Sequence, residues 1–309
     1  MKKLLFSLMV SLLAALLIST AVHAANQQKG VSVTPSIAHI DLAIDPPDYT
    51  LTYTNNYNTD ITLNLSAKDF TELEDSYKLE FLNQTQSENY KYSLSSWLSF
   101  ENQTLELSPN ETKSIKVFID KNRITKGGHY ASILAEIIQN PTQKNIAIKA
   151  ILSSLLFVRA STGKEIEEGK ISSFETSRDL LDFPNNFLLR FQNNGNVHVI
   201  PYGLVQIYDP LGHVVAKGIL NENSLDALPE SIRTYKIPVT EIKRLLLPGF
   251  YTAKINLHFG KTNQKLDAKV KFFSQGSFNF IKIGLGVILI TIILLFYKRR
   301  RGNKTRPNS

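Results

Sequence analysis

YTLTYTNNYNTDITLNL, residues 49–65, alternates large apolar side chains with polar ones on both sides of an Asn-rich centre. A period of two with aromatic and β-branched residues is typical of half-buried β-strands. Asn and Asp, by contrast, favour turns. We therefore expect strands at 49–53 and 61–65, with a turn at 55–60 between them.

The same alternation recurs along most of the chain. Further strands are predicted at 105–107, 115–119, 129–138, 146–158, 187–191, 197–208, 214–220, 233–237, 251–259 and 266–273. The strands at 105–107 and 115–119 flank the turn Pro109-Asn110 and should form a hairpin. A second hairpin should join 129–138 to 146–158. Many short strands separated by turn residues predict an all-β fold built of sandwiches.

The two halves of the chain repeat one scheme. Each has a strand that ends in an Asn-rich turn, at Asn55-Asn56 and at Asn193-Asn194. Each also has a late strand that opens on glycine and an aromatic residue. We predict two tandem immunoglobulin-like β-sandwiches, an outer one at 25–159 and a membrane-proximal one at 171–274, joined by a polar linker at 160–170.

The C-terminal part carries a long apolar run, 278–297, followed at once by basic residues. Residues 280–297 would extend about 27 Å as a helix, close to the thickness of a bilayer's hydrocarbon core. This pattern predicts a transmembrane helix at 278–297 with a basic cytoplasmic tail at 298–309. The predicted anchoring residues at its two ends are Lys282, Lys298, Arg299, Arg300 and Arg301.

The N-terminus has the pattern of a secretory signal peptide. Lys2 and Lys3 precede an apolar core, and Val22-His23-Ala24 offers a small-residue cleavage site. The alternative is an uncleaved signal anchor. With a signal at 1–24 and one later span, we expect a single-pass protein of the cell membrane, with its sandwiches outside and its C-terminus in the cytoplasm.

Composition limits the partners and the chemistry. The formal net charge is +8, and the basic residues of 1–24 and 298–309 account for all of it. The region between is formally neutral, so the sequence predicts no nucleic-acid partner. The chain has no cysteine, which excludes disulfides, thiolate metal sites and cysteine nucleophiles and fits a bacterial envelope protein.

No catalytic or metal-binding motif is recognisable. Apart from the one in the signal, the histidines are scattered: His39, His129, His198, His213 and His258. None forms a pair at short ligand spacing, so each is read as a strand-face histidine, although His198 could meet His213 or His258 across strands. Trp97, the only tryptophan, is expected in the core. The sequence predicts no cofactor and no enzyme, with an enzyme on envelope polymers as a rival that lacks a visible site.

Several motifs resemble the N-terminal domain of the WxL-interacting surface proteins of bacteria. They are Trp97-Leu98, Leu105-x-Leu107-x-Pro109-Asn110-Glu111-Thr112, Val117-x-Ile119 and Gly127-Gly128-His129-Tyr130. Residues 191–199, 201, 203 and 209–212 are similar to the membrane-proximal domain of comparable anchored proteins. A more distant similarity is to major-sperm-protein and pilus-chaperone-type sandwiches. The resemblance implies an outer domain that binds the cell wall and an inner one that meets surface or host partners, although fold likeness alone does not carry function.

These features predict a membrane-anchored tethering protein that contacts a cell-wall polymer or another surface protein. The alternative is a membrane-held assembly factor, either chaperone-like or a structural subunit of a surface complex. Exposed strand edges are candidate contact surfaces. The loop region 79–92 is another, because Phe81, Tyr90 and Tyr92 interleave there with polar residues. Membrane lipid is the further partner expected for the C-terminal helix.

Overall fold

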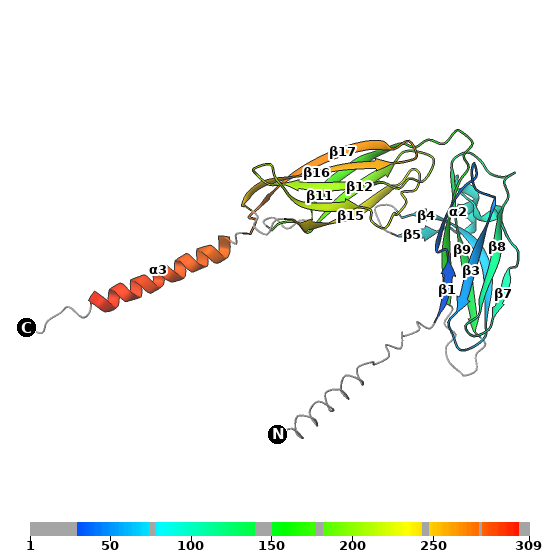
Figure 1. The fold of residues 1–309 in the computed structure, drawn as a ribbon, viewed down its shortest axis with the longest axis horizontal. Helices are drawn as coiled ribbons and strands as arrows, with labels where there is room; N and C mark the ends of the chain where they lie inside the picture. The colour runs from blue at the N-terminus through cyan, green and yellow to red at the C-terminus, as the bar shows by residue number, and fades with distance from the viewer. Residues whose placement is uncertain are drawn as a thin grey trace, which may run out of the picture.

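The computed structural model describes residues 30–73, 78–139, 150–176, 182–242, 247–277 and 280–302. Strands make up two separate bodies that meet at a bend, and one helix follows them (Figure 1). The prediction of an all-β fold is confirmed. The predicted signal peptide, 1–24, lies outside the described residues.

The first sandwich has two layers of sheet. One layer has the order β1-β3-β8-β6. Its strands are β1 (Val31–Thr34), β3 (Asp48–Asn55), β8 (Thr112–Ile119) and β6 (Leu98–Phe100). All of the pairs in this layer are antiparallel.

The second layer has the order β2-β10-β9-β4-β5, with β7 also paired to β4. Its strands are β2 (Ile37–Asp41), β10 (Ala150–Arg159), β9 (Gly128–Gln139), β4 (Ile61–Glu72), β5 (Leu79–Phe81) and β7 (Thr104–Leu107). Its β2–β10 pair is parallel, and the other pairs are antiparallel. The N-terminal chain therefore changes layer between β1 and β2.

The core of the first sandwich follows the alternation seen in the sequence. Leu51 and Tyr53 of β3, and Ile61, Leu63 and Leu65 of β4, are all buried in one cluster between the layers. The strands predicted at 49–53 and 61–65 are thus confirmed. Trp97, as expected, packs against this core.

One predicted hairpin is wrong. β7 pairs with β4 in one layer, whereas β8 pairs with β3 and β6 in the other. The turn at Pro109-Asn110 therefore carries the chain across the core instead of folding it back within one sheet. Alternation gives the face that each strand buries, but it does not say which strand lies beside it. The second predicted hairpin is confirmed for the described residues, because β9 and β10 pair in antiparallel register, whereas 146–149 of the predicted strand lie outside them.

The second sandwich is one folded sheet with the order β11-β12-β15-β14-β13-β16-β17. Its strands are β11 (Gly169–Thr176), β12 (Asn186–Asn193), β13 (Tyr202–Tyr208), β14 (Val214–Leu220), β15 (Ile232–Glu241), β16 (Gly249–Phe259) and β17 (Gln264–Ser274). β15 pairs with β12 over most of its length and with β14 at its end. This switch brings the two halves of the sheet face to face around a core rich in phenylalanine and tyrosine.

A short helix, α2 (Gln84–Asn89), interrupts the strands of the first sandwich. The Asn83 side chain accepts from the backbone N–H of Gln86, and the Gln86 side chain accepts from the backbone N–H of Asn83. This reciprocal pair is a capping box, which satisfies two N–H groups at the start of a helix.

The C-terminal helix α3 (Phe280–Gly302) forms where the sequence predicts a helix. Within the described residues, however, no helix is long and apolar enough to cross a membrane. The predicted transmembrane helix at 278–297 and the predicted single-pass location in the cell membrane are therefore wrong. Lys282 and Lys298 leave 15 uncharged residues between them. That run extends only about 22 Å as a helix, against about 30 Å of hydrocarbon. The anchoring role predicted for Lys282, Lys298, Arg299, Arg300 and Arg301 rested on this span.

Candidate functional site

An aromatic cluster joins the two sandwiches. Its buried members are Phe70, Tyr92, Tyr130 and Phe157 of the first sandwich and Leu228 of the second. The ring pairs Phe70–Phe157 and Tyr130–Phe157 meet edge-on, each with centroids 5.6 Å apart, a favourable geometry for aromatic side chains. This face of the first sandwich is therefore a buried interface, although it lies outside the main core.

Charged groups cross the same junction. Arg233 Nη1 lies 2.9 Å from Glu72 Oε1, and Ser231 Oγ donates to Glu72 Oε2 at 2.9 Å. Burial raises the pKa of Glu72, and the Arg233 charge opposes that shift. An exposed pair, Lys91 and Glu230, lies nearby with a separation of 2.6 Å. These contacts hold the second sandwich in a defined position on the first.

A cleft of about 460 Å³ also opens at the junction. Arg159 Nη1 pairs with Glu167 Oε1 at 2.6 Å inside it. Lys261 and Ser161 both donate to the Asp41 carboxylate. Although burial opposes its charge, these hydrogen bonds lower the pKa of Asp41 to about 2. Asp41 is thus paired with donors from the linker and the second sandwich, and Glu167 with a donor from β10 of the first sandwich.

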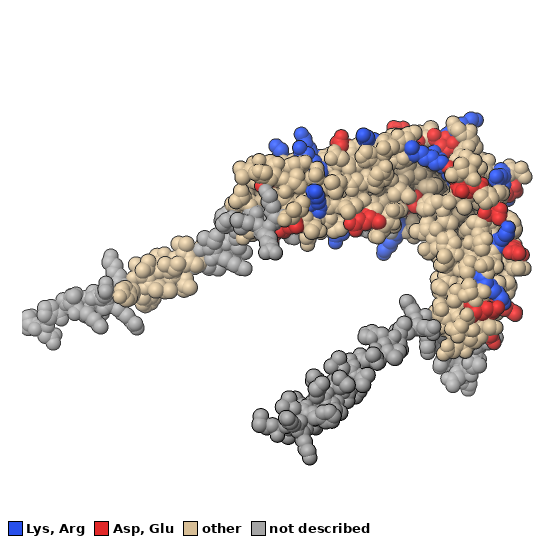
Figure 2. Space-filling view, viewed as in Figure 1, with Lys and Arg blue, Asp and Glu red and all other residues tan. Residues whose placement is uncertain are grey.

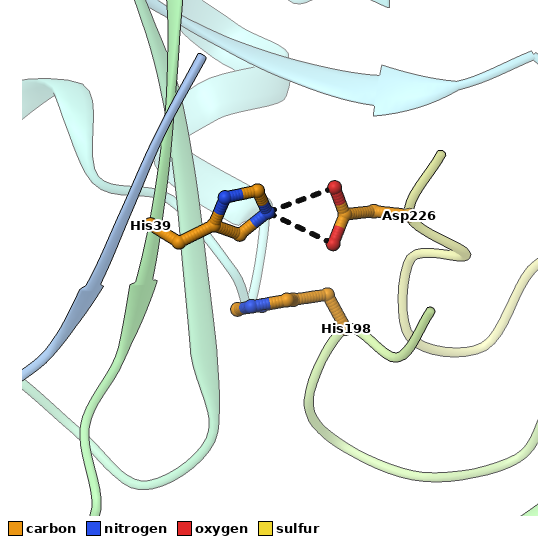
Figure 3. Close-up of side chains that lie close together, drawn as sticks. All are labelled: His39, His198 and Asp226. Atoms are coloured by element: carbon orange, nitrogen blue, oxygen red, sulfur yellow. Dashed lines mark hydrogen bonds and ion pairs between the residues drawn. The ribbon is translucent and has the colours of Figure 1, made fainter. Parts of the chain in front are cut away.

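Two histidines and an aspartate converge where this cleft meets the aromatic cluster (Figure 3). His39 Nε2 lies 3.1 Å and 2.9 Å from the two carboxylate oxygens of Asp226. The His198 ring lies beside them, with its centroid 5.6 Å from that of His39. One potential ligand atom from each residue lies within 4.8 Å of the other two. We call His39, His198 and Asp226 the junction triad.

Local structure explains how each member of the junction triad is positioned. His39 alternates with core-facing Ala38 on β2, so its ring faces the second sandwich. His198 lies between two buried valines, and the second of these, Val199, exchanges backbone hydrogen bonds with Ala227. This bridge holds Asp226, the residue before Ala227, next to His198.

The members of the junction triad differ in how far they are exposed to solvent. His39 is 41% exposed at its side chain, whereas Asp226 is only 4% exposed. His39 stacks on Phe157 at 4.9 Å, and His198 meets the same ring edge-on at 5.4 Å. Burial lowers the pKa of His198 to about 4. At neutral pH His198 is therefore an uncharged imidazole with a nitrogen lone pair available.

The sequence did not reveal this cluster. Each histidine was read as a strand-face residue, and His213 or His258 was named as a possible neighbour of His198, whereas the structure places the His198 ring beside His39. In the chain, His39 lies 187 residues from Asp226. No short motif could therefore have signalled the triad, and only the fold brings its members together.

The predicted contact residues have different environments. Phe81 lies on β5 and is 44% exposed. Tyr90 is half-buried at the end of α2 and lines a groove of about 860 Å³ with Trp97 and Arg123. Tyr92 is 3% exposed and packs inside the aromatic cluster. Partner contact by Phe81, Tyr90 and Tyr92 stays a prediction.

The free edge of β10 is a second candidate site. β9 pairs with the whole of β10, from Ala150 to Arg159, whereas β2 pairs only with Leu155–Arg159. Residues 150–154 thus have no ladder partner on the β2 side within the described part of the chain. The gap arises because the N-terminal chain pairs with β3 up to Thr34 and reaches β10 only from Ile37.

No protein-family model matches the sequence, and no curated protein matches it. Among solved structures, the chain is similar to the Class 5 fimbriae chaperone CfaA, with a TM-score of 0.41 and 12% identity over 78% of this chain and 98% of that one. It is similar to the E. coli chaperone DraB, with a TM-score of 0.38 and 11% identity over 77% and 98%.

A third similar structure is a chain of a chaperone–tip adhesin complex of CFA/I fimbriae biogenesis. Its TM-score is 0.39, with 13% identity over 80% of this chain and 100% of that one. At such low identities and TM-scores the likeness does not assign a function. The resemblance to WxL-interacting surface proteins stays a prediction.

Proposed function

We propose that this protein is a chaperone-like assembly factor that binds an extended segment of another protein by adding it as a strand to the free edge of β10. In this proposal it acts by binding and not by catalysis. The observation that carries the proposal is the half-paired state of β10, whose residues 150–154 pair with β9 but lack a ladder partner on the β2 side among the described residues.

The backbone of β10 supports this proposal. Leu155 N–H donates to Ser36 O on the β2 side. Because neighbouring residues in a strand direct their backbone groups to opposite sides, Ser153 and Ile151 direct theirs to the same open side as Leu155. Open N–H and C=O groups on a strand edge form a template for another strand. A partner segment can therefore continue the ladder that β2 begins.

The edge of β10 carries an exposed apolar side chain. Ile151 of β10 is 59% exposed and Ile138 of β9 is 41% exposed. Ile151 lies opposite Glu136, so Ile151 and Ile138 share the outer face of the sheet. An added strand with an apolar residue beside Ile151 would cover that side chain, at about 25 cal/mol for each Å² of apolar surface removed from water. The edge thus fits an apolar strand of a protein better than a polar sugar chain.

A photo-crosslinking amino acid at position 151 tests the proposal. We expect it to capture one protein from the native envelope, through a single extended segment. The matched control places the same group at Ile219, which is 52% exposed on the second sandwich. Ile151→Lys should abolish binding of the captured segment, whereas Ile219→Lys should not. Equal capture at both positions would contradict the proposal.

A second candidate function is binding of an anionic polymer to the outer face of the second sandwich. Lys217, Gln206, Lys254 and Lys269 lie opposite one another across β14, β13, β16 and β17. All three lysines are exposed, and the two on neighbouring strands face each other directly. Figure 2 shows Lys and Arg side chains projecting from this sandwich. Like charges placed opposite each other destabilise a sheet, so a lysine row favours a polyanionic partner.

Cosedimentation with purified cell-wall polymer separates the two functions. If the lysine row binds, replacing Lys217, Lys254 and Lys269 by Gln should abolish a salt-sensitive interaction. The same change at the exposed residues Lys121, Lys126 and Lys164 removes equal charge elsewhere and should have little effect. No loss in the first variant would exclude the lysine row as the binding surface.

A further inference from the structure

We propose that the junction triad, His39, His198 and Asp226, binds one divalent transition-metal ion across the two sandwiches, with Zn²⁺ the best fit. This proposal is independent of strand addition at β10. It concerns residues that come from both bodies of the protein and that meet only in the folded chain.

The donor set suits zinc. Imidazole nitrogen and carboxylate oxygen bind Zn²⁺ at about 2.0–2.2 Å, and three protein ligands with one open position are common. Donors around such an ion lie about 3.3 Å apart. The His39 and Asp226 donors are already at 2.9 and 3.1 Å, and the full set lies within 4.8 Å. Binding of an ion would draw the more distant ligand atoms closer together.

The aspartate is in an unusual electrostatic position. Its carboxylate is buried, and within the described residues its only side-chain partner is His39. Arg233 lies close, but it donates to the backbone carbonyl of Asp226 and pairs with Glu72. A buried carboxylate without a full cationic partner is costly. A bound dication would supply the missing positive charge.

The neighbouring residues hold the ligands in orientation. His198 Nδ1 lies 3.3 Å from Tyr130 Oη, and the backbone N–H of His198 donates to the same oxygen at 2.8 Å. Metal-bound histidines usually engage their second nitrogen in such an outer contact, which fixes the ring. The other ring nitrogen of His198 is then left for the ion.

The site can be reached from solvent. His39 and His198 both line the cleft of about 460 Å³ at the junction. An ion can therefore enter without unfolding of either sandwich, and its open position faces the cleft. Because β2 belongs to the first sandwich and the other two ligands to the second, binding also stabilises the junction.

Isothermal titration of the metal-stripped full-length protein with Zn²⁺ tests this proposal. We expect one ion per chain and a higher melting temperature with Zn²⁺. Co²⁺ bound in its place should give the visible absorption bands of a low-symmetry nitrogen and oxygen site. His39→Gln and Asp226→Asn should each weaken Zn²⁺ binding at least tenfold and abolish the change in melting temperature.

His213→Gln is the matched control, because His213 also lies beside an aspartate, with Nδ1 3.4 Å from Asp209 Oδ2. It should leave Zn²⁺ affinity unchanged. His39 is partly exposed, so its variant is expected to fold, and circular dichroism checks this. The proposal is overturned if the wild-type protein binds no Zn²⁺. It is also overturned if the folded His39→Gln and Asp226→Asn variants bind as tightly as wild type.

Discussion

The hydroxyl of Tyr130 accepts a hydrogen bond from the backbone N–H of His198 at 2.8 Å. The two residues belong to different sandwiches and lie 68 positions apart in the chain. Tyr130 is fully buried in the aromatic cluster, so this bond connects the packed interface to the junction triad. The relative position of the sandwiches is thus specified by buried groups of both.

Gly128→Ala should disturb this contact. A Cβ at Gly128 would lie 1.9 Å from Tyr130 Oη and 2.7 Å from Cζ, so the ring would have to move. Displacing a buried ring in a packed core costs about 1–3 kcal/mol. Urea unfolding should show this loss, whereas Gly30→Ala, which has open space around its Cβ, should be close to wild type. Equal stability of the two variants would show that the Tyr130 contact is unimportant.

Glu72→Gln should be strongly destabilising. It leaves Arg233 buried without its carboxylate partner, and breaking a buried ion pair in this way typically costs about 3–5 kcal/mol. The exposed pair between Lys91 and Glu230 is the matched comparison, and Glu230→Gln should cost less than about 1 kcal/mol. Free energies of unfolding for the two variants decide the matter. A small effect at Glu72 would mean that Arg233 finds water at the junction.

The junction should lose stability at acid pH, when Glu167 takes up a proton. Although burial opposes its charge, hydrogen bonds from Lys261 N–H and Arg159 lower the pKa of Glu167 below its usual 4.5. The folded state therefore binds fewer protons than the unfolded state as pH falls below about 4.5. The stability that the Glu167 carboxylate provides is therefore present above about pH 4.5 and is lost as the pH falls further.

Unfolding free energies of wild type and Glu167→Gln, measured from pH 6 down to pH 3, test the effect. The difference between them should be largest at the upper end and shrink as the pH drops. Glu222→Gln, at an exposed glutamate, controls for general acid effects. A difference that stays constant with pH would contradict the role of the Glu167 carboxylate in stability.

Asn55 and Asn193 should contribute similarly to stability, one in each sandwich. Asn55 Nδ2 donates to the carbonyls of Thr59, Leu107 and Ser108, and Asn193 Nδ2 donates to those of Val197 and Ala227. Substitution by Ala removes these hydrogen bonds to backbone carbonyls, at a cost of about 1–3 kcal/mol. Both Ala variants should lower the melting temperature. Asn194→Ala, at an exposed neighbour, should not.

These two asparagines show how far the sequence could predict the fold. The Asn-rich turns marked corresponding points in the two halves, because a turn needs local hydrogen bonds that Asn supplies. The strands 49–53 and 61–65 followed from alternation, which records burial directly. The capping box of Asn83 and Gln86 was also readable, yet α2 was not predicted. Residues 197–201 were predicted as strand, but β13 begins only at Tyr202, and the segment before it makes one isolated bridge, from Val199 to Ala227.

Local sequence patterns could not predict the contact between the two sandwiches. The rings of Tyr92 and Phe157 face the second sandwich, and alternation cannot distinguish such a face from one exposed to water. The partial pairing of β10 depends on where the N-terminal chain changes layer, which is a tertiary event. The same holds for the junction triad, whose members meet through the packing of one sandwich on the other.

Hydrogen exchange of the full-length protein, with and without the segment captured at position 151, is the most direct test of strand addition. The account predicts slower exchange at the outward-facing amides of Ile151 and Ser153, with no change along the lysine row on β16 and β17. Unchanged exchange at Ile151 and Ser153 in the saturated complex would contradict it.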